Sequence, residues 1–284
     1  MRPMGDNSAS HRSVGFLLDL MDTGDAERIR RRIGMPVHAR VDSAGDRAQL
    51  ISSWTWRAVP SSVLLWVLEE DDPDLNAVVW RHSNADDSMR RAILRGVPFG
   101  PGRTARVPVD SVLRGSEEPP VPKGYARQGL VGALRQATAM APARQAASMV
   151  LERADWRTVA EADRERPLPG YARWALVVRP DCPPELRTQF GAHRKFTNRV
   201  RRAGVLDGPA EYAATHGPAS DTLHVLSLGH LLFPARVRDA EDALRPLVRD
   251  HLGDREEAWA VLAQLVGSFH GTVPELVATA GAIA

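Results

Sequence analysis

Arginine is the residue type whose number and spacing in this chain could support binding chemistry. Lysine and arginine total 37, and only Lys123 and Lys195 are lysines. A planar guanidinium group can donate two parallel hydrogen bonds to a phosphate or a carboxylate, so a surface that gathers several of them attracts nucleic acid. The predicted binding residues form two clusters, and they are Arg90, Arg91, Arg95, Arg194, Lys195, Arg199, Arg201 and Arg202.

The same clusters also have a purely structural interpretation. Arginine is favourable near the C-terminal end of a helix, where it faces the negative end of the helix dipole. Basic residues outnumber acidic ones by only 37 to 35, a net charge of +2. The preference for arginine, with abundant Ala, Gly and Pro, resembles the codon usage of a GC-rich bacterial genome. Solvated helix faces are therefore the simpler explanation of the clusters.

Few other residues are spaced for catalysis or metal binding. The chain has no phosphate-binding loop, no dinucleotide fingerprint and no HExxH pair. His216, His224 and His230 are eight and six residues apart, on no common helical face, so we expect no metal site and no cofactor. Cys182, the single cysteine, precedes two prolines, and we interpret it as a packing residue. One cysteine excludes an internal disulfide and indicates a cytoplasmic location.

The elements that would position these side chains are short helices with marked ends. Asp72 and Pro73 predict the start of one helix; Asp86 or Asp87 predicts the start of the next, which Gly96 ends. The apolar segment 61–70 before them predicts a buried helix, although a strand of this length has the same pattern. Further helices are predicted at 14–21, 25–33, 47–56, 125–153 with one break at Ala141-Pro142, 155–164, 171–178, 184–191, 194–203, 209–215, 222–233, 237–252, 254–269 and 274–280.

Composition divides the chain into four parts. Residues 1–13 are polar and predict a disordered N-terminal tail, and residues 14–96 predict an N-terminal helical region. Residues 97–122 carry six prolines and three glycines, a density that forbids long helices and predicts a loop or a linker. Residues 123–284 predict a C-terminal helical region, which could continue the N-terminal part as one solenoid. No apolar run is long enough to span a membrane, so no membrane contact is expected.

Three short stretches repeat one pattern, an arginine-rich helix end followed by glycine and an apolar residue: IRRRIGMP at 29–36, RAILRGVP at 91–98 and RVRRAGVL at 199–206. GYAR also occurs twice, at 124–127 and 170–173, 46 residues apart. That interval is typical of two- and three-helix repeats. From about residue 58 onward the chain thereby resembles helical-repeat proteins of the HEAT, armadillo and leucine-rich-repeat-variant kind. No consensus spans the whole chain, and the Pro-rich segment has no place in a regular array.

The predicted fold class is all-α, an irregular α-solenoid or helical-repeat array of short helices. An irregular α-helical bundle is the alternative, and a mixed α/β fold is the third candidate. The resemblance implies a non-catalytic interaction or adaptor protein that binds a protein or peptide partner. A nucleic-acid-binding protein with an arginine-lined surface is the alternative. An enzyme resembling the HEAT-like DNA glycosylases is the second alternative, in which Asp155 and Trp156 would be nearest to that family's carboxylate and groove tryptophans.

Overall fold

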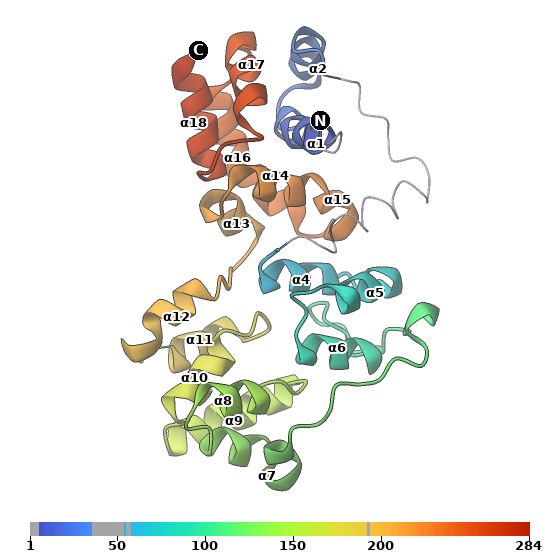
Figure 1. Ribbon diagram of the computed structural model, residues 1–284, viewed down its shortest axis with the longest axis vertical. Helices are drawn as coiled ribbons and strands as arrows, with labels where there is room; N and C mark the ends of the chain where they lie inside the picture. The colour runs from blue at the N-terminus through green and yellow to red at the C-terminus, as the bar shows by residue number, and fades with distance from the viewer. Residues whose placement is uncertain (1–5, 36–53, 55–57, 192–193) are drawn as a thin grey trace. The chain divides into compact units, whose positions relative to one another are not determined.

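Helices are the only regular elements in the residues that the structure describes, so the predicted all-α class is confirmed. In segment 61–70, for which the sequence leaves a strand open, Ser61–Leu68 forms a helix. The helices are short and belong to two compact units, unit 1 with Met1–Trp54 and Asp207–Ala284, and unit 2 with Thr55–Leu206 (Figure 1). No described helix is both long and apolar enough to cross a membrane. The structure is a computed structural model, and it describes residues 6–35, 54, 58–191 and 194–284.

Unit 1 joins segments from the two ends of the chain, because α1 packs against α14 and α17, and α2 packs against α17. Helix α1 begins at Asp6, so residues 6–13 belong to a helix and not to a tail. Its residues Val14, Leu17 and Leu18 are buried, and such packing outweighs the polar composition of the first turns. The predicted helix at 47–56 lies outside the described residues except for Trp54, which is buried. The helices of unit 1 are α1 (Asp6–Leu18), α2 (Thr23–Arg32), α13 (Pro209–Thr215), α14 (Ala219–Ser227), α15 (Gly229–Leu232), α16 (Val237–His251), α17 (Glu256–Leu265) and α18 (Val273–Ile283).

Unit 2 is an array in which helices pack mainly on near neighbours in sequence: α4 on α5, α5 on α6, α7 on α8 and α9, and α10 on α8 and α11. Segment 97–122 lies inside this unit, as the long connection from α6 to α7 in Figure 1. The two units therefore do not follow the boundaries that composition suggests. The helices of unit 2 are α4 (Ser61–Leu68), α5 (Pro73–Arg81), α6 (Asp87–Leu94), η1 (Ser111–Leu113), α7 (Lys123–Arg135), α8 (Met140–Ala146), α9 (Arg153–Glu165), α10 (Gly170–Val177), α11 (Pro184–Phe190), η2 (Arg194–Phe196) and α12 (Thr197–Arg202).

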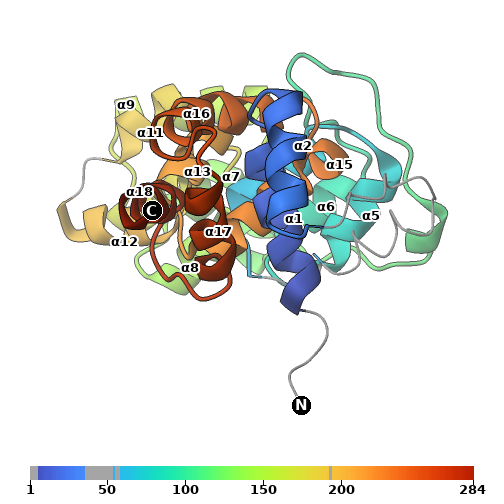
Figure 2. The same ribbon diagram turned by 90° about the horizontal axis from the view of Figure 1, so that it is seen from above.

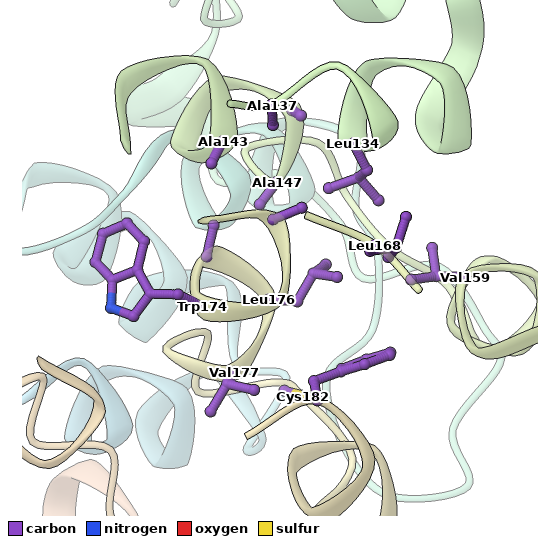
Figure 3. Packing of buried hydrophobic residues seen from close by; sticks show 14 of the residues in the cluster. Leu134, Ala137, Ala143, Ala147, Val159, Leu168, Trp174, Leu176, Val177 and Cys182 are labelled. Atoms are coloured by element: carbon purple, nitrogen blue, oxygen red, sulfur yellow. The ribbon is translucent and has the colours of Figure 1, made fainter. Parts of the chain in front are cut away.

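One hydrophobic core of unit 2 gathers residues from α7 to η2 (Figure 3). Leu134 of α7, Val159 of α9 and Leu176 of α10 meet there, with Ala147 just after α8. Cys182 belongs to the same core, and burial raises the pKa of its thiol to about 12. This is the environment expected of a packing residue.

The ends of the helices follow the local signals in the sequence. The side chain of Asp72 caps α5 by accepting the N–H groups of Asp74 at 2.8 Å and Leu75 at 3.3 Å. Asp86 caps α6 by accepting the N–H of Met89 at 2.9 Å. These bonds satisfy donors that the first turn of a helix leaves without an internal acceptor.

The glycines of the arginine-rich repeat share one backbone conformation. Gly34, Gly96 and Gly204 have φ values of 68°, 63° and 63°, the left-handed region in which glycine commonly ends a helix. The two copies of GYAR lie in the first turns of α7 and α10. Each repeated stretch thus marks the end or the start of a helix.

Candidate functional site

A closed loop of unit 2, residues 96–107, is the most irregular part of the Pro-rich segment. The N–H of Val107 donates to the carbonyl of Gly96 at 2.9 Å and closes the base of the loop. A Cβ atom on Gly96 would lie 2.4 Å from the carbonyl oxygen of Val107, so only glycine fits at this base. A compact loop whose ends meet is an Ω-loop, a class that often carries function.

The buried carboxylate of Asp71 fixes the far side of this loop. Its Oδ1 accepts the N–H of Phe99 at 2.7 Å, its Oδ2 accepts the N–H of Gly100 at 3.1 Å, and the side chain is 3% exposed. Arg103 reaches back, with Nη1 at 3.5 Å from the same Oδ2 and 3.1 Å from the carbonyl oxygen of Glu70. Asp71 has a φ of 54°, which non-glycine residues adopt rarely. These contacts hold segment 97–103 on the α4–α5 turn.

Helix α9 lies next to the loop, and two hollows open beside them. One measures about 690 Å³ and lies between the loop and the start of α9; the other measures about 790 Å³ and lies between the tip of the loop and one face of α9. Arg95 lines the first hollow but is paired with Glu118. We define the loop–α9 surface by the other exposed arginines that line the two hollows: Arg103, Arg106, Arg153, Arg157 and Arg164.

Burial and hydrogen bonds fix the orientation of α9. The side chain of Asp163 is 3% exposed; it accepts two hydrogen bonds from Arg173 of α10, at 2.8 and 2.9 Å, and one from the N–H of Leu168 at 2.9 Å. Trp156 is 5% exposed, and the guanidinium of Arg179 lies 5.6 Å from the centre of its ring. With one face held in this way, α9 presents its arginines on the other.

The carboxylates beside the loop–α9 surface are partly occupied by structural contacts. Asp155 accepts the N–H of Glu152 at 2.9 Å in the capping box of α9. Asp181 receives two hydrogen bonds from Arg179, at 2.9 and 2.6 Å. By contrast, four arginines of the surface make no ion pair among the residues that the structure describes, and these are Arg106, Arg153, Arg157 and Arg164. Glu152 and Glu185 also line the hollows, so six arginines, with Arg95, stand against four carboxylates and the lining keeps a small net positive charge.

The first predicted cluster is directed largely into the protein. Arg91 is fully buried, and its Nη1 donates to Glu118 Oε1 at 3.1 Å and to the carbonyl of Pro119 at 2.6 Å. Arg95 is half-exposed and pairs with the same Glu118 oxygen at 2.6 Å. Arg90 donates to two carbonyl groups at the end of α5, both at 3.2 Å. The contacts of Arg91 and Arg95 attach segment 97–122 to α6, which explains why the segment belongs to unit 2.

The second predicted cluster lies on α12 and the short helix before it. The ammonium group of Lys195 lies 5.1 Å from the centre of the Tyr171 ring, and the guanidinium of Arg199 lies 5.9 Å from that of Phe196. The side chains of Arg194, Arg201 and Arg202 lie outside the described residues. Figures 1 and 2 show α6 and α12 on opposite sides of unit 2, so the structure does not bring the two clusters together.

The remaining candidates have structural contacts of their own. Asp155 lines the smaller hollow but acts as a helix cap, and Trp156 is a core residue, so no catalytic role follows from their geometry. His224 is buried in α14, and His230 lies 2.6 Å from Glu241. Among the described residues no three His, Cys, Asp or Glu side chains gather as a metal site would require.

Charge is distributed unequally between the two units. Unit 2 carries 24 arginines and lysines against 17 aspartates and glutamates, a net charge of +7. Unit 1 carries the remaining 13 basic and 18 acidic residues, a net charge of −5. The total of +2 thus conceals a basic unit and an acidic one, and charge per unit is the better guide to binding.

Comparisons with protein-family models, with characterised proteins and with solved structures find no match to this chain. Its function must therefore be argued from the site alone.

Proposed function

We propose that unit 2 binds nucleic acid through the phosphate backbone, with the loop–α9 surface as the contact area. The observation that supports this proposal is that exposed arginines gather on the loop held by Asp71 and on one face of α9. Each guanidinium can donate two hydrogen bonds to a phosphate, and the net charge of +7 adds attraction at longer range.

Backbone recognition fits this surface better than base reading. Contacts to phosphate fix the position of a protein on nucleic acid and carry no sequence information by themselves. No catalytic step is part of the proposal, because Asp71 holds the loop and Asp155 holds the start of α9.

The experiment measures fluorescence anisotropy of labelled single-stranded and duplex oligonucleotides over a range of salt concentrations. The logarithm of the association constant falls against the logarithm of salt with a slope of about −0.9 per phosphate contact for duplex DNA. One phosphate contact for each of the four arginines without an ion pair predicts a slope of about −3.6. The double substitution Arg106→Gln/Arg153→Gln removes two of these contacts and should make the slope shallower by about two units.

A matched pair of substitutions separates a local surface from general attraction. Arg114 and Arg238 are exposed and lie outside the loop–α9 surface, so Arg114→Gln/Arg238→Gln removes the same charge elsewhere. This pair should leave the slope nearly unchanged. Equal losses of affinity from the two pairs, or no salt-dependent binding by the unaltered protein, would refute the proposal.

A further inference from the structure

A third hollow of unit 2 has a different lining from the loop–α9 surface. We call it the α7–α8 groove; it measures about 870 Å³ and shares no lining residue with the other two hollows. Segment 120–122 forms one apolar wall, and Ala147, Ala175 and Val178 form the other apolar part. The groove thus places two apolar walls on either side of one hollow.

The central feature of this groove is an exposed valine in segment 120–122. Val121 is 47% exposed, one of the few large apolar side chains in that state in the described part of the chain. Prolines precede and follow it, and they hold the backbone extended. Arg91 fixes the start of this segment, because its guanidinium donates a hydrogen bond to the carbonyl of Pro119. Val121 is therefore held in place next to apolar neighbours.

Three exposed cations line the groove beside this apolar area, and the buried Arg179, also in the lining, is paired with Asp181. Lys123 and Arg127 lie one turn apart on α7, and Arg144 of α8 is held with its guanidinium 5.1 Å from the centre of the Trp174 ring. All three are exposed, and in the described ranges none of them pairs with a carboxylate. They would complement carboxylates placed near an apolar side chain.

We infer that the α7–α8 groove binds a short peptide segment in which acidic and apolar residues lie close together. An apolar side chain would cover Val121 and Val178, and neighbouring carboxylates would meet Arg127 and Arg144. Nucleic acid fits less well, because a phosphate backbone supplies no apolar group to cover Val121 and Val178 beside the cations. This inference does not rest on the proposed function, since the two sites share no residue.

The experiment selects a phage-displayed library of random dodecapeptides on the full chain and measures the enriched peptides by anisotropy. The expected sequences carry Asp or Glu within two residues of Leu, Ile or Phe. Replacing the apolar residue of such a peptide by serine should weaken binding at least tenfold, and Arg127→Gln/Arg144→Gln should do the same.

Two matched controls test where the peptide binds. Val121→Ser should weaken binding severalfold, whereas Val112→Ser, at an exposed valine outside the groove, should leave it unchanged. Arg106→Gln/Arg153→Gln should also leave peptide binding unchanged. Thermal unfolding of each variant checks that these exposed substitutions preserve the fold.

Several outcomes would overturn the inference. Failure to enrich any peptide, or enrichment of basic ones, would contradict it directly. Equal binding by the serine-substituted peptide would show attraction by charge alone. A loss of oligonucleotide affinity in Arg127→Gln/Arg144→Gln as large as that in Arg106→Gln/Arg153→Gln would assign the groove to nucleic acid instead.

Discussion

Asp71→Asn is the substitution that most directly tests whether the loop is held by one carboxylate. Asparagine tolerates the left-handed backbone at this position, so the change should not strain the turn. Its single oxygen can still accept the N–H of Phe99, but the amide nitrogen would then face the N–H of Gly100, donor against donor. The substitution also removes the charge opposite Arg103.

The size of the effect follows from the hydrogen bonds that the carboxylate accepts. A hydrogen bond to a charged group contributes about 1.5 to 3 kcal/mol, and a buried donor left without an acceptor costs about 1 to 3 kcal/mol. We expect the free energy of local opening of the loop to fall by about 2 to 3 kcal/mol. Amide hydrogen exchange at Phe99 and Gly100 should therefore become about 30 to 150 times faster, since each 1.4 kcal/mol is about tenfold.

The neighbouring residue provides the control. Asp72 caps α5, and asparagine caps a helix about as well as aspartate, so Asp72→Asn should leave exchange in the loop unchanged. Unchanged exchange at Phe99 and Gly100 in Asp71→Asn, or faster exchange spread evenly over α4 to α6, would refute the reasoning.

The same variant also separates positioning from charge. Removing a negative charge should by itself tighten the binding of an oligonucleotide. Release of the loop should weaken binding instead, because Arg103 and Arg106 would lose their fixed place beside α9. Weaker binding by Asp71→Asn would therefore support positioning, and tighter binding would show that net charge decides.

Three further predictions concern contacts within unit 2. Asp163→Asn, which removes one charge from a buried pair, should lower the free energy of unfolding by about 3 kcal/mol, measured by urea denaturation. Because burial raises the pKa of Cys182 to about 12, a thiol-reactive disulfide at pH 8 should react with it only after unfolding. Burial alone would raise the pKa of Glu118, but hydrogen bonds from Arg95 and Arg91 outweigh it and lower the pKa. The ionised Glu118 therefore contributes stability above about pH 4.5, and this contribution is lost as pH falls through the lowered pKa. The difference in free energy of unfolding between the unaltered protein and Glu118→Gln should shrink on acidification, and denaturation followed by circular dichroism measures it.

The helix ends of this chain could be predicted from local residues, because their causes are local. Asp72, Asp86 and Gly96 act within one turn of where they stand, so the sequence around them is sufficient. The start of the predicted helix at 254–269 shows the limit: α17 begins at Glu256, two residues after the predicted start, with Arg255 before it.

The position of the Pro-rich segment could not be predicted in the same way. Its attachment depends on Asp71 and on Arg91 with Glu118, residues that lie 27 to 29 positions from their partners. A high proline content indicates only that no long helix forms there. Whether such a segment is a linker or a packed loop depends on these distant contacts.

The arginines show why clusters in sequence are a poor guide to clusters in space. Successive residues on a helix point about 100° apart, so Arg90 and Arg91 cannot share one face, and each is used to fasten a different neighbour. Residues spaced four and eleven apart do share a face, as Arg153, Arg157 and Arg164 do on α9. Helical spacing among arginines therefore predicts a shared face, but not whether that face meets solvent. Arg91 and Arg95 are also four residues apart, and both bind Glu118, a residue more than twenty positions away whose place the spacing does not reveal.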